Sequence, residues 1–510
     1  MDFYSVLFLH SDEAVTEEKA ESPDCFQDLH LDQIVESITS GWKEYQLAPF
    51  FHSPLREVDQ VVYRQEVMED LQHCSALTFI NAFAGQMRTV RDRLKTADKL
   101  YYKYAIERWH LGTVDLYCEA VVSLLEGLCT CDLKSRGLHT FREYLKTYVQ
   151  SDDFCSLRKE ARQIKSDLGE IRYCVLIRGG SVTVRHYDGE PDYSMAVEDA
   201  FRKFRNGGVR GRRLRIPKWT GMNHVEAAIL DRVALLYPDA FRALDEFCAN
   251  HAEFVDHTLA RFDREIQFYA AYLSHIDKFR HGGLPFCIPQ LSTEKDICGH
   301  NVFDLALAEK LIGQKSTVVC NDFFLSHPER IFVVSGPNQG GKTTFARMIG
   351  QLHYLGSLGC PVPGTDARLF LFDRLFTHFE RQEDIDSLRG KLQDDLVRIR
   401  AILDQATPNS IIVMNEIFSS TTVQDALFLA AEIMKRITDL DAIAVCVSFL
   451  DELASLNEKT VSMVSTVDPH NPAVRTFKVV RRQADGLAYA VAIAEKHRVT
   501  YRWLKERVTK

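Results

Sequence analysis

A glycine-rich loop between an apolar run and a helical stretch constrains this chain most. The run Ile331 to Ser335 leads directly into Gly336-Pro-Asn-Gln-Gly-Gly-Lys-Thr343, and residues 344–355 have the pattern of a helix. Glycines let the backbone curl so that successive N–H groups face a phosphate, and the helix N-terminus adds positive partial charge. This order is typical of a P-loop and predicts binding of ATP or GTP, with a structural glycine turn as the alternative.

The loop supplies most of the expected nucleotide contacts. Lys342 would reach the β and γ phosphates and assist catalysis, and Thr343 would hold Mg²⁺. The residues expected to bind the nucleotide are Gly336, Pro337, Asn338, Gly340, Gly341, Lys342, Thr343 and Thr344.

A second apolar run, Ser410 to Met414, precedes Asn415 and Glu416. A P-loop site needs such a strand to present acidic groups to the metal and to the attacking water. Glu416 is therefore the candidate general base, and Asn415 stands where an aspartate normally holds the metal. An amide keeps an acceptor oxygen but removes a charge, so we expect weaker metal retention and slower turnover. The alternative is that both residues merely end a strand.

Composition bounds the class of protein. The chain has 510 residues, 46% of them hydrophobic, which gives room for about three domains with a substantial core. Its 13 cysteines form no CxxC pair, which predicts mostly reduced core cysteines in a cytoplasmic protein. The apolar run from Phe3 to Leu9 reads as a buried segment or strand rather than a secretory signal, and no stretch approaches transmembrane length.

The net charge of the chain is −9, and by itself this argues against a uniformly basic nucleic-acid binder. One segment is nevertheless strongly basic. Between residues 202 and 218 there is no acidic residue, and three glycines interrupt a run of cations. The cations are Arg202, Lys203, Arg205, Arg210, Arg212, Arg213, Arg215 and Lys218. A flexible positive loop points to a polyanion such as DNA, and a solvated charge run is the alternative.

The first half of the chain has the periodicity of long helices. Helices are predicted over 76–108, 113–128 and 135–148. Apolar runs at 172–177 and 182–184 flank Gly179-Gly180 and predict a β-hairpin. Residues 241–278 contain neither glycine nor proline, which predicts one helix roughly 55 Å long. Two arms with a tip between them are implied, and an ordinary helical bundle is the alternative.

These patterns predict mainly α-helical structure with a small β insertion, followed by an α/β P-loop domain. The expected divisions are an N-terminal segment at 1–28, helices at 29–170, the β-containing insertion at 171–220, further helices at 221–288 and the P-loop domain at 289–510.

Several motifs together resemble the ATPase domain of the MutS family. The stretch 335–347 is similar to the family's narrow GPNxGGKS/T loop, and 373–377 is similar to its Asp-Arg-Ile/Leu-Phe-Thr element. The resemblance is close over 289–508. It is looser over 29–285, where it rests on the helix layout, the basic hairpin and residues 63–66. Further similar segments are the signature-like loop 383–396 with Ser387, the stretch 419–425 after Glu416, and the closing stretch 477–494.

The resemblance implies a homodimeric ABC-type ATPase that uses ATP and Mg²⁺. Each nucleotide site would be completed by the partner's signature loop, so that Ser387 would touch the γ phosphate across the dimer. The helical regions would be core and lever domains that transmit the ATP state to clamps closing around DNA, and the 171–220 insertion would be such a clamp, with its basic loop near the phosphate backbone.

Two departures from the family shape the expected function. The helical core begins within about the first thirty residues, so no mismatch-reading domain or connector is expected, and direct mismatch recognition is not expected either. Phe449 stands where the family has a histidine that senses the γ phosphate. With Asn415, this predicts slow hydrolysis.

Two functions of different classes remain open. The first is an ATPase that clamps duplex or branched DNA with little regard for sequence. The second is a mainly structural, ATP-gated assembly factor that recruits downstream repair or recombination proteins and hardly turns over. An SMC-like or transporter-type ATPase fits less well, because the chain has no Leu-Ser-Gly-Gly signature and no membrane partner segment.

Overall fold

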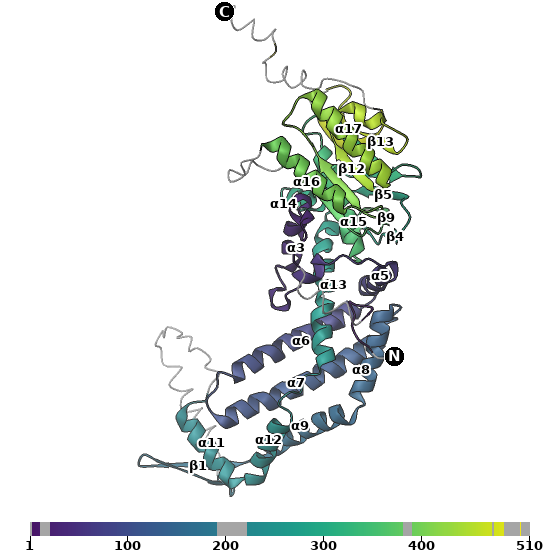
Figure 1. Cartoon of the computed structure of the whole chain (residues 1–510). Coiled ribbons are helices and arrows are strands. Elements are labelled where there is room, and N and C mark those ends of the chain that lie inside the picture. The colour runs from purple at the N-terminus through teal and green to yellow at the C-terminus, as the bar shows by residue number, and fades with distance from the viewer. Residues whose placement is uncertain are drawn as a thin grey trace, which may run out of the picture. The chain divides into compact units, whose positions relative to one another are not determined.

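The computed structural model describes residues 3–10, 21–190, 222–380, 390–471, 474–483 and 500. The basic residues between 202 and 218, and Ser387, lie outside the described residues. The chain divides into two units, and Figure 1 labels many of their elements. The first unit comprises residues 1–74, 133–140 and 261–510, and the second comprises 75–132 and 141–260.

The second unit is mainly helical. Its elements are α6 (Ala76–Ala97), α7 (Lys103–Cys129), α9 (Asp152–Glu170), β1 (Tyr173–Arg178), β2 (Ser181–His186), α11 (His224–Leu236) and α12 (Pro238–Asn250), and α8 (Arg136–Val149) and α13 (His257–His281) each contain residues of both units. Helices α6 and α7 pack so closely that a Cβ added to Gly127 would lie 2.4 Å from the Phe79 ring. The hairpin prediction is confirmed, and Gly179 and Gly180 supply its turn with φ of 55° and 85°.

Two predicted helices have the wrong ends. The helix predicted over 76–108 stops at Ala97, and the next begins at Lys103 rather than at residue 113. The connecting residues contain neither glycine nor proline, so the apolar periodicity runs on across the turn. The helix predicted over 135–148 is confirmed as α8.

The single helix predicted over 241–278 is also wrong. The structure has α12 and α13 with a break over residues 251–256. The break is held by tertiary contacts: Phe254 is buried with its ring edge toward Tyr117, and the Asp256 backbone N–H donates to the Tyr117 hydroxyl at 3.1 Å. Asp256 Oδ1 accepts the Leu259 N–H at 2.9 Å near the start of α13. The long helix predicted here is therefore two shorter helices.

The first unit begins with the buried segment that the sequence predicts: Phe3, Val6, Leu7 and Phe8 are all buried. Its helices are α2 (Cys25–Leu29), α3 (Leu31–Thr39), η1 (Lys43–Tyr45), α4 (Ala48–His52), α5 (Val58–His73), α14 (Leu305–Gly313), α15 (Lys342–Ser357), α16 (Lys391–Gln405), α17 (Val423–Leu440) and η2 (Asp451–Ser455).

The described residues of this unit also form three sheets. The largest has the order β10 (Leu375–His378), β11 (Ile411–Asn415), β12 (Ile443–Val447), β7 (Ile331–Ser335), β13 (Thr460–Val467) and β14 (Arg475–Arg481), and only its β13–β14 pair is antiparallel. A second sheet has the order β4 (Gln290–Ser292), β9 (Asp366–Phe370), β5 (Ile297–Val302) and β6 (Asn321–Leu325). A third pairs β3 (Phe286–Cys287) with β8 (Val362–Pro363).

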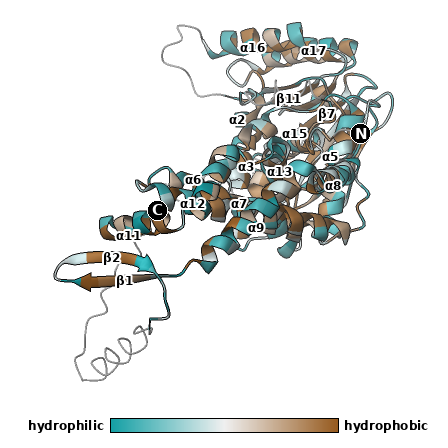
Figure 2. Cartoon of the chain, turned by 90° about the horizontal axis from the view of Figure 1, so that it is seen from below, coloured by the Kyte–Doolittle hydropathy of each residue, from teal (hydrophilic) through white to brown (hydrophobic). Residues whose placement is uncertain are grey.

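Helices cover both faces of the largest sheet, as expected for a largely parallel sheet. Helices α16 and α17 lie on one face and α15 on the other (Figure 2). Ile331, Met414 and Cys446 pack with α17 residues in one buried cluster, while Phe332 on the opposite face contacts Phe345 of α15. The strands predicted at 331–335 and 410–414, and the helix between them, are thereby confirmed.

The structure bears on the predictions about cysteines and about membrane-spanning stretches. All 13 cysteines are free, but only Cys25, Cys118, Cys131, Cys360 and Cys446 are buried, so fewer belong to the core than predicted. Among the described helices, none combines the length and the apolar character needed to cross a bilayer.

Candidate nucleotide-binding site

The glycine loop joins the end of β7 to the start of α15, as its sequence predicts. Gly336 and Gly341 have φ of 114° and 94°, a region that side chains disfavour. A Cβ at Gly336 would lie 2.8 Å from the Ser465 carbonyl oxygen, so space as well as conformation requires glycine there. The loop therefore presents bare backbone at the N-terminus of α15, which is the arrangement that anions favour.

Ser465 holds this loop, and the sequence analysis did not identify it. This buried residue of β13 donates its hydroxyl to the Gly340 carbonyl oxygen at 2.6 Å. A Cβ on Gly340 would lie 2.3 Å from the same hydroxyl oxygen, so the contact depends on glycine at that position. No signal in the sequence marks this role, because β13 also contains Thr460, Ser462 and Thr466.

The Lys342 ammonium is surrounded by loop oxygens. Nζ donates to the carbonyls of Gly336 at 3.0 Å and Pro337 at 3.2 Å, and to Asn338 Oδ1 at 3.4 Å. It also lies 4.4 Å from the centroid of the Phe449 ring, within cation–π range. Burial lowers the pKa of Lys342, while the negative charge of Glu416 opposes that shift. The group expected to reach the phosphates thus has partners within its own loop.

The two predicted metal-binding residues contact each other. The Thr343 hydroxyl donates to Asn415 Oδ1 at 2.9 Å, across the gap between α15 and β11. Both contacting atoms are oxygens, the ligand type that Mg²⁺ prefers. The glycine cradle and this oxygen pair therefore fit a magnesium–nucleotide complex, in which Thr343 and Asn415 would face the metal.

Glu416 follows Asn415 at the end of β11. Its backbone has a φ of 54°, and its N–H donates to the Val447 carbonyl oxygen at 2.9 Å, which ties it to the end of β12. Burial raises the pKa of Glu416, Lys342 lowers it, and Glu380 raises it further. A half-buried carboxylate with a raised pKa is a stronger base than an exposed one.

Two charged residues near the loop were missed by the sequence analysis. Glu380 accepts hydrogen bonds from Lys391 and, at 3.3 Å, from the Ser419 hydroxyl, and the Lys391 bond lowers the pKa of Glu380. Arg475 on β14 donates from Nε to the Asn338 carbonyl oxygen at 3.2 Å. Their places depend on strand order, which no local motif encodes.

The structure brings the described candidates to one edge of the sheet. Lys342 and Thr343 begin the helix after β7, Asn415 ends β11 with Glu416 directly after it, and Phe449 follows β12. Pro337, Asn338, Gly340 and Gly341 lie in the loop, and Thr344 lies in the first turn of α15. Carboxyl ends of parallel strands are the usual place for ligands in such sheets.

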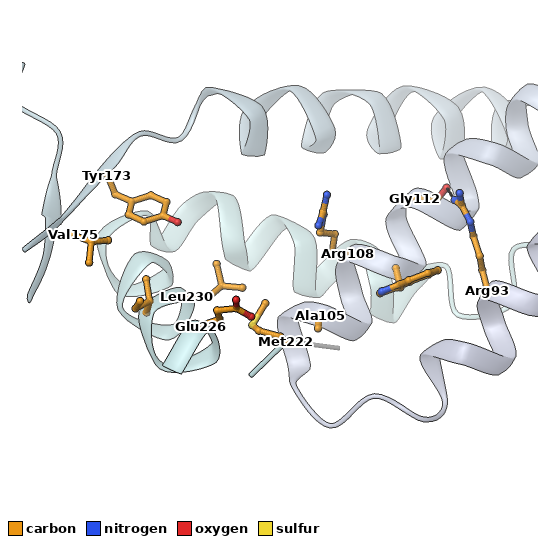
Figure 3. A pocket seen from close by; sticks show the side chains of 11 residues that line it. Arg93, Ala105, Arg108, Gly112, Tyr173, Val175, Met222, Glu226 and Leu230 are labelled. Carbon is orange, nitrogen blue, oxygen red and sulfur yellow. Dashed lines mark hydrogen bonds between the residues drawn. The ribbon is translucent and has the colours of Figure 1, made fainter. Parts of the chain in front are cut away.

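A separate hollow lies in the second unit (Figure 3). It has a volume of about 690 Å³, and its lining residues include Arg93, Arg108, Trp109, Tyr173 and Glu226. Arg93 is already engaged, because Nη1 donates to the Gly112 carbonyl oxygen at 3.0 Å and the guanidinium lies 5.9 Å from the Trp109 ring. None of the predicted nucleotide-binding residues that the structure describes lines this hollow.

Comparisons with known proteins point to one family. The family model of MutS domain V matches residues 332–506. Proteins described as DNA mismatch repair protein MutS are similar to this chain: the one from Halalkalibacterium halodurans is 31% identical over 182 residues, 35% of this chain and 21% of the relative. The Chlorobaculum tepidum relative is 26% identical over 272 residues, 52% of this chain and 30% of the relative. The matched part therefore spans less than a third of these relatives.

The Ser465 contact leads to a prediction. Ser465→Ala removes the partner of the Gly340 carbonyl, and such a hydrogen bond contributes about 1 kcal/mol. We expect binding of a non-hydrolysable ATP analogue, measured by calorimetry, to weaken by ~5-fold. Ser462→Ala on the same strand is the matched control, since its buried hydroxyl has no partner among the described residues. Equal affinity in the two variants would exclude a role for Ser465 in shaping the loop.

Proposed function

The chain belongs to the MutS family, and from that premise we propose that it is an ATPase coupling ATP binding and slow hydrolysis to closure on duplex or branched DNA. The observation that carries the proposal is the meeting of three strand ends, where Lys342, the Thr343–Asn415 pair and Glu416 surround one glycine loop. Fold membership alone would not specify an activity, whereas this set of side chains supports phosphoryl transfer to water.

Each residue has a role in the proposed reaction. The loop N–H groups and Lys342 would hold the phosphates, with Lys342 leaving its loop carbonyls to do so. Thr343 and Asn415 would orient Mg²⁺, which supplies charge neutralisation between the β and γ phosphates. Glu416 would accept a proton from water placed in line with the γ phosphate, helped by the burial that raises its pKa.

Slow turnover follows from two side chains. Asn415 offers the metal an amide oxygen in place of a charged carboxylate, which weakens the attraction for Mg²⁺. Phe449, half exposed with 50% of its surface accessible, lies on the Lys342 ammonium and has no hydrogen-bond donor for a γ phosphate. Loss of charge at one position and of a donor at the other lowers stabilisation of the transition state.

The same Phe449 contact favours a second candidate function. If the ring and the loop carbonyls keep Lys342 from the developing charge, the protein would bind ATP and hardly hydrolyse it. It would then act as an ATP-gated assembly factor for proteins of DNA repair or recombination. Steady-state hydrolysis separates the two candidates.

Removal of the proposed base tests the enzyme. Glu416→Gln keeps the size of the side chain but cannot accept the proton, so we expect kcat to fall by ~10²-fold or more. Binding of the ATP analogue should persist, because the loop is untouched. Glu458→Gln, at an exposed position in the turn before β13, is the matched control and should hydrolyse ATP like the parent.

A pH profile provides a second readout for Glu416. The active form is the carboxylate, and its raised pKa means that activity is lost, as the pH falls, at a higher pH than for a glutamate near 4.3. The parent should show this acidic limb in kcat. A Glu416→Gln rate equal to that of the parent would rule out the hydrolytic mechanism and leave the assembly factor.

A second copy of the chain is the proposed partner at the nucleotide site. Ser387 of that copy would approach the γ phosphate, as the family resemblance implies. Support comes from two exposed apolar side chains in the first half of α17, Val423 with 71% and Phe428 with 67% of the surface accessible. Phe428 is the larger of the two, and its exposed ring is apolar surface that a second copy would cover.

Dimerisation should depend on the nucleotide. The parent with Mg²⁺ and a saturating non-hydrolysable ATP analogue should double its mass in light scattering, and Lys342→Ala should not. Phe428→Asp should oppose dimerisation while retaining analogue binding, because it places a charge in an apolar contact. Leu235→Asp, at a similarly exposed apolar position of α11, is the control. A parent that stays monomeric with analogue and DNA present would overturn the proposal.

The basic loop is the proposed DNA contact. The logarithm of the DNA-binding constant falls linearly with the logarithm of the salt concentration, and each cation that neutralises a phosphate adds about 0.9 to the magnitude of that slope. Changing Arg212 and Arg213 together to alanine should therefore reduce the slope for duplex binding by about two units. Lys310 and Lys315, both exposed, provide a control pair of equal charge. An unchanged slope would remove the loop from the DNA path.

Mismatch recognition is not part of the proposal. The expectation that a mispaired base adds little affinity stays a prediction from the sequence. Gel shifts on paired, mispaired, forked and four-way DNA, each with ATP, ADP or no nucleotide, test it in the same experiment as the preference for branched DNA.

A further inference from the structure

Three potential metal ligands meet on the four-stranded sheet, in a cluster that plays no part in the proposed nucleotide chemistry. Cys298 and His300 lie on β5 and Asp366 lies on β9. One ligand atom from each residue lies within 4.8 Å of the other two. Cys298 is half-buried, while His300 and Asp366 are exposed, so an ion could reach the cluster from solvent.

Strand register explains why the three side chains share a face. His300 pairs directly with Asp366 across the antiparallel β5–β9 ladder, and residues directly opposite each other project to the same side. Cys298 is two residues before His300, so it also faces that side. Gly299 between them belongs to the other face, where an added Cβ would lie 2.6 Å from the buried Phe323 ring.

Backbone contacts fix the position of the His300–Asp366 pair. The Thr365 N–H donates to the His300 carbonyl oxygen at 2.9 Å, and the Thr365 hydroxyl donates to the same oxygen at 3.2 Å. Asn301 Nδ2 in turn donates to Thr365 Oγ1 at 3.4 Å. These hydrogen bonds hold β5 next to the start of β9, so the backbone positions of His300 and Asp366 do not depend on one flexible side chain.

A second carboxylate stands behind the histidine. Asp322 Oδ1 lies 3.8 Å from His300 Nδ1 and accepts the Asn301 N–H at 2.7 Å. A carboxylate near the ring is the common partner of a metal-binding histidine, which it orients by a hydrogen bond, and the 3.8 Å separation must shorten for Asp322 to form that bond. This neighbour is an observation independent of the three ligand atoms.

Charge at this face also suits a divalent cation. Arg368 pairs with Cys298 across the ladder and contributes one positive charge. Asp366, Asp322 and a cysteine bound as the thiolate contribute three negative charges. The excess of two negative charges is what a divalent ion neutralises.

We propose that Cys298, His300 and Asp366 form a zinc-binding site, with water as the fourth ligand. Zn²⁺ binds sulfur, imidazole nitrogen and carboxylate oxygen together, whereas Mg²⁺ and Ca²⁺ prefer oxygen alone. Tetrahedral bonds of about 2.0–2.3 Å place ligand atoms ~3.5 Å apart, so the side chains need to draw in by roughly 1 Å. The site is independent of the proposed ATPase.

Zinc content tests the site in the full-length reduced chain without nucleotide. After equilibrium dialysis against micromolar Zn²⁺ and gel filtration, elemental analysis should find one zinc per parent chain. Cys298→Ser should lose it, and Cys129→Ser, at an exposed cysteine outside the cluster, should keep it. Equal zinc in Cys298→Ser and the parent, or no zinc in the parent, would overturn the proposal.

Two further measurements separate ligation from folding. Cobalt added to the parent should give the charge-transfer absorption of a cobalt–thiolate bond, and Cys298→Ser should not. Asp322→Asn keeps an acceptor for the Asn301 N–H but loses the charge beside His300, so zinc affinity should fall by ~10-fold. Zinc should raise the unfolding temperature of the parent but not of Cys298→Ser. Equal shifts in both proteins would contradict ligation by this sulfur.

Discussion

The parallel pairing of β11, β12 and β7 is the constraint on which the nucleotide site depends. Asn415 is opposite Val447 on β12, and Val447 is opposite Val334 on β7, so three strands end level with one another. Residues separated by more than 70 positions then meet, as the 2.9 Å bond between Thr343 and Asn415 shows. β13 completes the arrangement, because its pairing with β7 brings Ser465 under the glycine loop. Sheet register thus fixes both the groups proposed to react and the loop that would hold the phosphates.

The resting contacts of Lys342 connect the local structure with the proposed slow cycle. A buried ammonium needs partners, and here the loop carbonyls and the Phe449 ring provide them. A triphosphate must replace these contacts with stronger, charge-assisted ones, so part of the binding energy is spent on releasing the lysine. The same holds for Asn415, because its hydrogen bond to Thr343 must open or be shared when a metal binds. In the proposed cycle, the departures at Phe449 and Asn415 would therefore act on binding as well as on hydrolysis.

Features encoded locally could be predicted from the sequence, and those set by tertiary contacts could not. Apolar runs and glycines within about thirty residues predict the β7 strand, the glycine loop and α15. Gly179-Gly180 likewise predicts the hairpin. Ser465 was missed because only strand order brings it to Gly340. The break between α12 and α13 was missed because Tyr117, far away in sequence, holds the Asp256 backbone. The spacing of apolar residues predicts which face of a helix is buried, but it does not predict a helix end that is set by contact with a residue distant in sequence.

Donor chemistry would let the chain hold two different ions without competition. Thr343 and Asn415 present oxygen atoms, which suit a hard ion that keeps much of its water. The β5–β9 cluster presents sulfur and imidazole nitrogen beside one carboxylate, a set that holds Mg²⁺ poorly and Zn²⁺ well. Both sites arise from strands placed side by side, yet the first uses the ends of parallel strands and the second uses the faces of antiparallel ones. Zinc at the cluster would therefore leave the magnesium-dependent chemistry proposed for the glycine loop unchanged.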